Sequence, residues 1–249
     1  MDIRQKNANF CVPLSQFSVS LSAMTLISAT EEDYLKTIYK LAEKQTEDQF
    51  VNTNAIAAQL NTKAASVTDM LKRLNEKDLL VHRPYKGVQL SLKGNQIARN
   101  LVRKHRLWEV FLVETLHFQW DEVHEIAEQL EHIHSAELID RLDDFLDNPK
   151  FDPHGDPIPD KDGHYTYLSE RLLAEFGERQ RVQIVGVKDH STAFLRYLAD
   201  QKLVLNTDIE IIKIHDYDFS MDVRFLKTRR ILTISQQVAQ NLYVIVPIH

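Results

Sequence analysis

Apolar residues recur at the helical spacing of three and four positions through the first half of the chain, and alternate with polar residues near its end. The helical spacing predicts helices over 30–44, with Thr30 as the N-terminal cap, over 52–61 and over 63–80. Residues 79–91 have the pattern of a strand, a turn with proline and glycine, and a second strand. Two short helices, a tight turn and a hairpin predict a winged helix-turn-helix.

Three further helices are predicted before a segment with several prolines and glycines that begins at 148. They cover 91–116, with Ser91 as the cap, then 122–134 and 135–147. Residues 148–163 contain four prolines and two glycines, which is typical of a linker. The middle of the chain is therefore expected to form a helical domain that ends in a linker.

The last part of the chain has short alternating runs, as β-strands do. The expected strands cover 181–189, 207–216, a stretch near 221–235 and 241–249, with a helix over 191–203 and a helical turn over 236–241. The chain is thus predicted to be mainly α with β. Its expected segments are an extension at 1–23, a winged-helix domain at 24–95, a helical domain at 96–147, a proline-rich linker at 148–170 and a small β-rich domain at 171–249.

The N-terminal residues contain a mildly apolar run that polar residues interrupt, which argues against a signal peptide. Met24 opens a run that resembles a natural start, so residues 1–23 are expected to be a disordered extension or the product of an upstream start assignment. The single cysteine, Cys11, excludes a disulfide framework and fits a reducing cytoplasm. No run approaches the roughly 20 apolar residues that span a bilayer, so no membrane partner is expected.

Charge is distributed unevenly along a chain whose formal net charge is −6. Residues 61–106 contain eleven Lys or Arg against three Asp or Glu, whereas residues 107–162 contain three against sixteen. A basic segment followed by an acidic segment suggests an anionic partner for the first and cations for the second.

The helix expected at 63–80 combines small, polar and basic side chains. A recognition helix must be slim to enter the major groove, where Ser, Thr and Asp can bond to base edges. Lys and Arg bind phosphates without reading the sequence. The excess of Lys and Arg over Asp and Glu in 61–106 favours binding to double-stranded DNA. The alternative is a winged-helix module that binds protein. The candidate DNA-binding residues are Lys63, Ala65, Ser66, Thr68, Asp69, Lys72 and Arg73, with Arg83 and Lys86 in the wing.

The run EVHEIAEQLEHIH at 122–134 places two imidazoles and two carboxylates on one helical face. His105 and Glu109 form a further pair, four residues apart, on the preceding helix. These residue types are metal ligands. The alternatives are a solvated polar face for the stripe and a surface hydrogen bond for the pair. The residues of the stripe, at positions i, i+4, i+7 and i+8, are His124, Glu128, Glu131 and His132.

An enzyme is a more distant alternative. A carboxylate-bridged di-metal enzyme needs paired Glu-x-x-His motifs on separate helices, and Glu131–His134 supplies one without a convincing partner. The run HEIAE at 124–128 only approaches the zinc-protease pattern HExxH, because its fifth residue is Glu. No nucleophile motif or glycine-rich phosphate loop occurs in the sequence. A binding function is therefore favoured.

Several runs of sequence occur in the order and spacing of one known family: EEDYLKTIY (31–39), SVTDMLKRLNEKDLL (66–80), LSLKG (90–94), RKHRLWE (103–109), EVHEIAEQLEHIHS (122–135) and GDPIP (155–159). Residues 24 to about 160 resemble the diphtheria-toxin-repressor family of metal-dependent transcriptional repressors, including its manganese-responsive branch. The resemblance implies a winged-helix DNA-binding domain and a helical metal-binding and dimerisation domain. It also implies, as in longer members, a C-terminal SH3-like (FeoA-type) small β-barrel.

The resemblance also implies two sets of metal ligands. In the family's iron branch, Met and Cys stand at the positions of Asp33 and Glu128 in the principal site. In longer members the C-terminal domain can add a ligand near the positions of Asp189, His190 and Ala193, of which only Asp189 and His190 could coordinate. The implied principal site is Asp33, Glu128, Glu131 and His132, and the implied ancillary site is His105, Glu109 and His124.

Carboxylates and imidazoles in place of thiolate and thioether favour Mn²⁺, with Fe²⁺ as the alternative metal. The manganese branch often has a second acid three residues after the Asp, where this chain has Lys36, so a closely spaced binuclear manganese site is not expected. The resemblance implies a homodimer that binds an operator and represses genes of metal-ion uptake and homeostasis. The remaining alternative is a winged-helix regulator with a structural metal or none.

The expected mechanism begins with carboxylates that repel one another in the metal-free protein and leave the first helix loosely placed. A divalent ion neutralises Glu128 and Glu131 and ties Asp33 to them, which fixes the winged helix relative to the dimer core. Metal binding and DNA binding are then reciprocally coupled.

Overall fold

The structure is a computed structural model that describes residues 27–43 and 50–247. The expectations for residues 1–23 and for Cys11 lie outside the described residues. The chain divides into two compact units. Of the described residues, the first comprises 27–43, 50–105, Leu130–Leu138 and Pro159–His164, and the second comprises Arg106–Gln129, Ile139–Ile158 and 165–247.

Helix α1 (Ala29–Glu43) opens the first unit and buries Leu35 and Ile38 completely. The Glu31 N–H donates to Ser28 Oγ at 3.3 Å, and the Ser28 N–H donates to Glu31 Oε2 at 2.9 Å. This reciprocal pair is a capping box, which a serine followed three residues later by glutamate can form. The expectation that Thr30 caps the helix was wrong, because Thr30 already lies inside it.

Helices α2 (Thr53–Gln59) and α3 (Ala64–Glu76) form the helix-turn-helix. The side chain of Asn52 caps α2 by accepting the Ala55 N–H at 2.8 Å. Helix α3 ends before the predicted boundary because Asp78 adopts a left-handed backbone with φ of 57°, which ends a helix. The buried face of α3 consists of Val67, Leu71 and Leu74.

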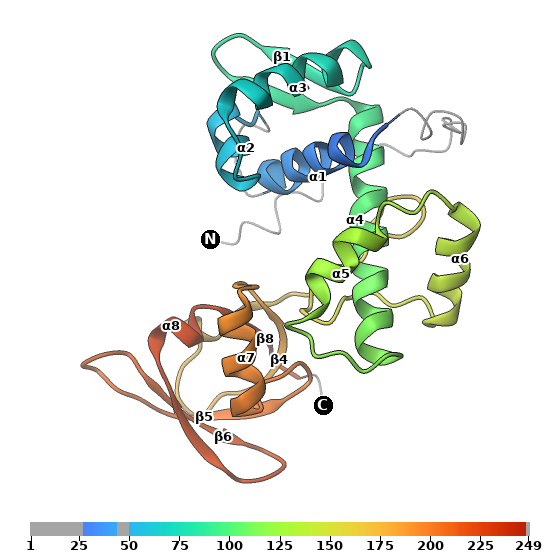
Figure 1. The fold of residues 1–249 in the computed structure, drawn as a ribbon. Coiled ribbons are helices and arrows are strands. Elements are labelled where there is room, and N and C mark those ends of the chain that lie inside the picture. The colour runs from blue at the N-terminus through green and yellow to red at the C-terminus, as the bar shows by residue number, and fades with distance from the viewer. Residues whose placement is uncertain (1–26, 44–49, 248–249) are drawn as a thin grey trace. The chain divides into compact units, whose positions relative to one another are not determined.

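Strands β1 (Leu80–Arg83) and β2 (Gly87–Leu90) form the predicted antiparallel wing. The wing lies beside α3 in the first unit (Figure 1). Val51 pairs with Val88 and so extends the hairpin on its other side. Gly87 has φ of 110°, and a Cβ there would come within 2.2 Å of the Val51 carbonyl oxygen. Glycine is therefore required for this pairing.

Helix α4 (Leu92–Glu114) begins at Ser91, whose hydroxyl accepts the Gly94 N–H at 3.0 Å, as the sequence predicts. The boundary between the two units falls within this helix, after His105.

Helices α5 (Val123–Leu130) and α6 (Ala136–Phe145) follow. The prediction that one helix extends through His134 was wrong, since α5 ends at Leu130 and the Ile133 N–H donates to the Leu130 carbonyl in a turn. Ser135 must leave helical geometry to cap α6, where its hydroxyl accepts the Leu138 N–H at 3.2 Å. Too few residues remain between the two helices for α5 to continue.

The segment at 150–158 is a tight turn closed by the bridge between Phe151 and Pro157. Asp152 Oδ1 accepts the backbone N–H groups of His154 at 2.8 Å and Asp156 at 3.0 Å. Gly155 has φ of 88°, and a Cβ there would come within 2.1 Å of the Val185 carbonyl oxygen in β4 (Arg181–Val187). This part of the expected linker is thus packed closely against the second unit's sheet.

The C-terminal part of the second unit is an antiparallel sheet in the order β3-β8-β4-β5-β6-β7. The predicted strand near 221–235 is a hairpin of two strands. Leu195 and Leu198 of α7 (Thr192–Gln201) pack into the core that the sheet forms (Figure 1). The other elements are β3 (Arg171–Leu172), the 3-10 turn Leu173–Glu175, β5 (Asp208–Ile214), β6 (Met221–Phe225), β7 (Ile231–Ile234), α8 (Gln236–Ala239) and β8 (Leu242–Ile245).

Among the helices of the described residues, none combines the length and the apolar character that crossing a bilayer requires.

Candidate metal centres and nucleic-acid interface

The first unit brings Asp33, Glu131 and His132 together, with one ligand atom from each lying within 4.8 Å of the others; we call this group the first cluster. Asp33 comes from α1, whereas Glu131 and His132 lie in the turn that follows α5. The early end of α5 therefore directs these two side chains through a turn rather than along a helical face.

Glu32 holds the imidazole of the first cluster. Its side chain is buried, and Glu32 Oε2 lies 2.6 Å from His132 Nδ1. A carboxylate accepts, so Nδ1 is the nitrogen that donates to Glu32, while the other ring nitrogen, Nε2, lies 3.2 Å from Asp33 Oδ1. An imidazole that donates through one nitrogen and offers the other is the usual arrangement of a metal-binding histidine.

Buried nitrogens surround Glu131. Lys36 Nζ lies 2.5 Å and His105 Nδ1 lies 2.6 Å from the same oxygen, Glu131 Oε2. Burial raises the pKa of Glu131, but the His105 hydrogen bond and the Lys36 charge outweigh burial and lower it. The repulsion expected among carboxylates is thus offset by neighbouring cationic and hydrogen-bonding groups in the first unit.

A second buried lysine lies near the same carboxylates. Lys104 Nζ donates to the Ile133 carbonyl oxygen at 3.5 Å, and its side chain is almost completely buried. Burial lowers the pKa of Lys104, while the charges of Glu32 and Glu131 act in the opposite direction.

Glu128, the remaining residue of the expected principal site, lies on α5 with a half-exposed side chain. In the second unit, its Oε1 is 3.4 Å from His124 Nε2, and His124 Nδ1 is 3.4 Å from Glu109 Oε1. The hydrogen bond to Glu109, then the one to Glu128, raises the pKa of His124 to about 9. His124 is therefore an imidazolium at neutral pH when no metal is bound.

The second unit also brings together Glu109, Asp152 and His154, with one ligand atom from each within 4.8 Å of the others; we call this group the second cluster. All three are buried. His154 Nε2 donates to the Trp120 carbonyl oxygen at 2.8 Å, and its Nδ1 lies 3.8 Å from Glu109 Oε2 and 3.9 Å from Asp152 Oδ1. One imidazole nitrogen and two carboxylates that converge in this way are of the types that bind metal ions.

Asp152 is a strongly perturbed acid of the second cluster. Burial, followed by the charges of Asp156 and Glu109, raises its pKa to about 7. Arg106 lies 3.5 Å from Asp152 Oδ2 and 3.3 Å from Asp156 Oδ2, so one guanidinium serves two carboxylates. The charge of Arg106 therefore does not fully offset burial and the neighbouring carboxylates at Asp152.

Sequence reasoning did not find Asp152 and His154, because four prolines and two glycines made their segment resemble a linker. The signal that could have found them is the run DPHGD, which places two carboxylates around an imidazole. His190, the further candidate ligand, lies with its Nε2 3.9 Å from Asp156 Oδ2 and its ring 5.3 Å from that of His154. Asp189 Oδ1 accepts the Ser191 N–H at 2.8 Å.

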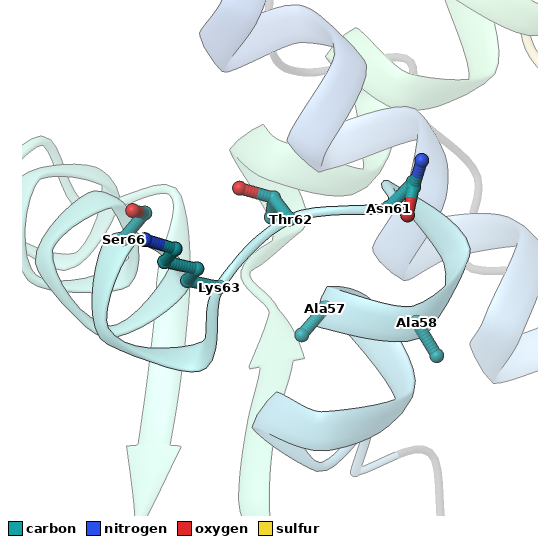
Figure 2. Close-up of a pocket in the computed structure, with 6 residues that line it drawn as sticks. All are labelled: Ala57, Ala58, Asn61, Thr62, Lys63 and Ser66. Atoms are coloured by element: carbon teal, nitrogen blue, oxygen red, sulfur yellow. The ribbon is translucent and has the colours of Figure 1, made fainter.

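Helix α3 exposes every candidate DNA-binding side chain that the sequence assigns to it. Its opposite face is buried, so the exposed side is presented to a partner. Figure 2 shows a hollow at the turn before α3, with Thr62, Lys63 and Ser66 on one side and two alanines of α2 on the other. The small side chains leave this turn accessible. The exposed residues are Lys63, Ala65, Ser66, Thr68, Asp69, Lys72 and Arg73.

The wing adds further exposed groups at its tip. Arg83 and Lys86 are exposed, and the Arg83 guanidinium stacks 4.8 Å from the centre of the Phe50 ring. Tyr85, which sequence reasoning did not select, is fully exposed and has φ of 67°. The tip therefore presents two cations and one aromatic ring.

Comparison with known protein families gives matches along most of the chain. Residues 26–88 match the family described as "Iron dependent repressor, N-terminal DNA binding domain". Residues 91–160 match "Iron dependent repressor, metal binding and dimerisation domain", and residues 171–246 match "FeoA domain".

Several individual proteins are similar to the chain. Iron-dependent repressor IdeR from Mycobacterium leprae is 35% identical over 130 residues, which is 52% of this chain and 55% of the relative, so the match spans about half of that protein. HTH-type transcriptional regulator MntR from Shouchella clausii is 37% identical over 119 residues, 46% of this chain and 78% of the relative. A solved "Manganese-dependent transcriptional repressor complex with manganese" has a TM-score of 0.74 at 30% identity, covering 87% of this chain and 100% of that structure.

Proposed function

Because the chain belongs to the diphtheria-toxin-repressor family of metal-dependent transcriptional repressors, we propose that it binds operator DNA as a Mn²⁺-loaded homodimer and represses genes of metal-ion uptake. The family consists of transcriptional regulators rather than enzymes. The proposal places the protein in the cytoplasm, where the operator lies.

The observation that carries the proposal is the origin of the first cluster's ligands. Asp33 comes from α1 of the DNA-binding region, while Glu131 and His132 come from the region that matches a metal-binding domain. An ion held by all three ties these regions together. If the arrangement in which these regions are tied together is also the one that binds DNA, the ion and DNA favour the same state. The free energy by which the ion promotes DNA binding then equals the free energy by which DNA promotes ion binding. We retain Glu128 as the fourth ligand of this principal site.

Mn²⁺ is proposed over Fe²⁺ from the chemistry of the donors. The first cluster offers two carboxylates and one imidazole, and Glu128 would add a third carboxylate. Oxygen-rich donor sets suit hard cations such as Mn²⁺, whereas thiolate and thioether ligands select softer ions. The similarity to a manganese-dependent repressor supports this choice, and the similarity to an iron-dependent repressor keeps Fe²⁺ as the alternative.

We propose that a second ion binds in the second unit. The expected ancillary ligands Glu109 and His124 are adjacent there, and Asp152 and His154 add a carboxylate and an oriented imidazole. His105, the third expected ancillary ligand, stands four residues before Glu109 on α4. His190 remains a candidate because of its closeness to the His154 ring.

The proposed DNA contacts and dimer rest on exposed surface. The exposed face of α3 would enter the major groove, and Arg83 and Lys86 would reach phosphates. The homodimer is supported by the match to a dimerisation domain. It is also supported by apolar side chains that the loop after α4 and the end of α6 leave exposed, which are Leu116, Phe118 and Phe145.

Binding to DNA under controlled metal supply tests the proposal. Duplexes selected from a random pool in Mn²⁺ are titrated with the full chain in Mn²⁺, in anaerobic Fe²⁺ and in EDTA. We expect Mn²⁺ to tighten binding by roughly 5- to 150-fold over EDTA, the usual range of such coupling. Equal affinity in EDTA would instead support a winged-helix regulator with a structural metal or none. Unchanged Mn²⁺ affinity in the Glu128→Ala, His132→Ala double variant would reject the principal site.

A further inference from the structure

We propose that Lys36 is a built-in competitor of the divalent ion, whose ammonium occupies Glu131 in the metal-free protein and so sets how much metal the protein needs. This inference rests on the proposed function, because it concerns the affinity of the first cluster.

The geometry places Lys36 inside the cluster rather than beside it. Lys36 follows Asp33 by three residues on α1, so both side chains project from the same face of that helix. Lys36 is 5% exposed, and its Nζ lies 2.5 Å from Glu131 Oε2. One helix therefore delivers both a candidate metal ligand and a cation to the same short turn.

The charge balance gives the sign of the effect. Glu131 is 1% exposed, and a buried carboxylate without a cation is strongly unfavourable. Lys36 removes this cost in the metal-free protein, so an incoming ion gains less by neutralising Glu131. If the ion binds while the ammonium remains, the two positive charges repel across one carboxylate. Both effects weaken metal binding.

A positioning role for Lys36 predicts the opposite sign. If the ammonium served mainly to orient Glu131 for the ion, its removal would weaken metal binding. The direction of the change in metal affinity therefore separates competition from positioning without reference to protein stability.

Lys104 provides a matched control within the same unit. It is also buried, at 2% exposure, and it feels the charges of Glu32 and Glu131. Its Nζ, however, donates to the Ile133 backbone carbonyl rather than to an oxygen of a candidate ligand. Loss of this ammonium removes a buried lysine while the direct contact between Lys36 and Glu131 is retained.

The test compares wild type, Lys36→Met, Lys36→Arg and Lys104→Met as full chains. Mn²⁺ affinity is measured by calorimetry with a competing chelator, and the Mn²⁺ concentration for half-maximal DNA binding is measured on one selected duplex. We expect Lys36→Met to tighten Mn²⁺ binding at least about tenfold and to lower that concentration in parallel. Lys36→Arg keeps a cation at Glu131 and should stay near wild type, while Lys104→Met, which leaves the Lys36–Glu131 contact in place, should tighten Mn²⁺ binding less than Lys36→Met.

Mn²⁺ affinity of Lys36→Met that is equal to or weaker than that of the wild type overturns the inference while the proposed function stands. Tightening of the same size in Lys104→Met also overturns it, because the effect is then not specific to the Glu131 contact. Absence of Mn²⁺ binding by the wild type overturns the proposed function and this inference together. If Lys36→Met is too unstable for calorimetry without metal, thermal unfolding with and without Mn²⁺ replaces it. If Lys36 competes with the ion, Mn²⁺ should raise the unfolding midpoint of Lys36→Met more than that of wild type. An equal or smaller rise overturns the inference.

Discussion

Glu131 of the first cluster and Asp152 of the second cluster are both buried carboxylates beside an imidazole, yet their pKa values move in opposite directions. Burial raises the pKa of both, but Glu131 receives two nitrogen donors on one oxygen and ends below its ordinary value. Asp152 shares Arg106 with Asp156 and ends near 7. The same residue types therefore favour the charged carboxylate at Glu131 and the protonated carboxyl at Asp152.

If ions bind at both clusters as proposed, this difference predicts different roles for them. An ion at the first cluster would compete with groups already present, which suits a sensor that responds only above a threshold. An ion at the second cluster would offset the charge around Asp152, which suits an ion that stabilises the fold of its unit.

The largest expected effect comes from removing the first cluster's imidazole. His132→Ala should weaken Mn²⁺ binding by more than about 100-fold, since loss of a mere supporting partner already costs about 10- to 100-fold. Mn²⁺-dependent DNA binding should disappear with it. Calorimetry and anisotropy on one selected duplex measure both.

His134→Ala is the control for that variant, because His134 Nδ1 lies 3.8 Å from Glu32 but is not part of the cluster. His154→Ala extends the comparison to the second cluster and should reduce the number of bound ions while some Mn²⁺-dependent DNA binding persists. If His154→Ala abolished that dependence as completely as His132→Ala, the two clusters would not have the separate roles argued above.

The next effect concerns the residue that orients His132. Glu32→Gln keeps an acceptor near His132 Nδ1 but removes the charge, and it should weaken Mn²⁺ binding by about 10- to 100-fold. Glu31→Gln is the matched control on the same helix. Glu31 contacts Lys77 and Ser28, so its substitution should lower the thermal midpoint and leave Mn²⁺ affinity near that of wild type. An affinity of Glu32→Gln equal to wild type would show that Glu32 does not support the ligand.

Sequence periodicity predicted the elements of the fold well where local signals agree. The helices at the start of the chain and the wing follow from apolar spacing and turn residues, and Ser91 caps α4 as expected. The end of α5 was mispredicted because the helical periodicity of the sequence continues through His132. Ser135 caps the next helix, and this capping signal, which periodicity does not detect, ends α5 earlier.

The candidate sites divide in the same way. Helical spacing and family resemblance selected Asp33, Glu131 and His132, which the fold brings together. Spacing could not reveal that Lys36 contacts Glu131, since the two residues are 95 positions apart in sequence. It also could not reveal that a proline-rich turn buries Asp152 and His154, because that burial depends on the close approach of Gly155 to β4.

A smaller effect is expected from the pH dependence that the second cluster imposes on the metal-free protein. The folded-state pKa of Asp152, about 7, lies above its unfolded value, so the folded state binds the extra proton. Stability should therefore fall as the pH rises from about 4 through 7. Asp152→Asn keeps a side-chain oxygen that can accept the backbone N–H groups of His154 and Asp156 but removes the charge. This variant should therefore lose much of the decrease in stability with pH. Denaturant unfolding of both proteins in EDTA across that range measures it, and parallel pH profiles would contradict the raised pKa.

The smallest effect is expected at His124, whose side chain is half-exposed and therefore partly screened. Its pKa in the folded protein, about 9, lies above the unfolded value, so its contribution to stability is fully present below about pH 6.5 and is lost as the pH rises through 9. His124→Gln should therefore be less stable than wild type at pH 6 and equal to it at pH values well above 9, measured as unfolding midpoints without metal. A difference that persisted at high pH would mean that packing of the ring, rather than its charge between Glu109 and Glu128, supports the fold.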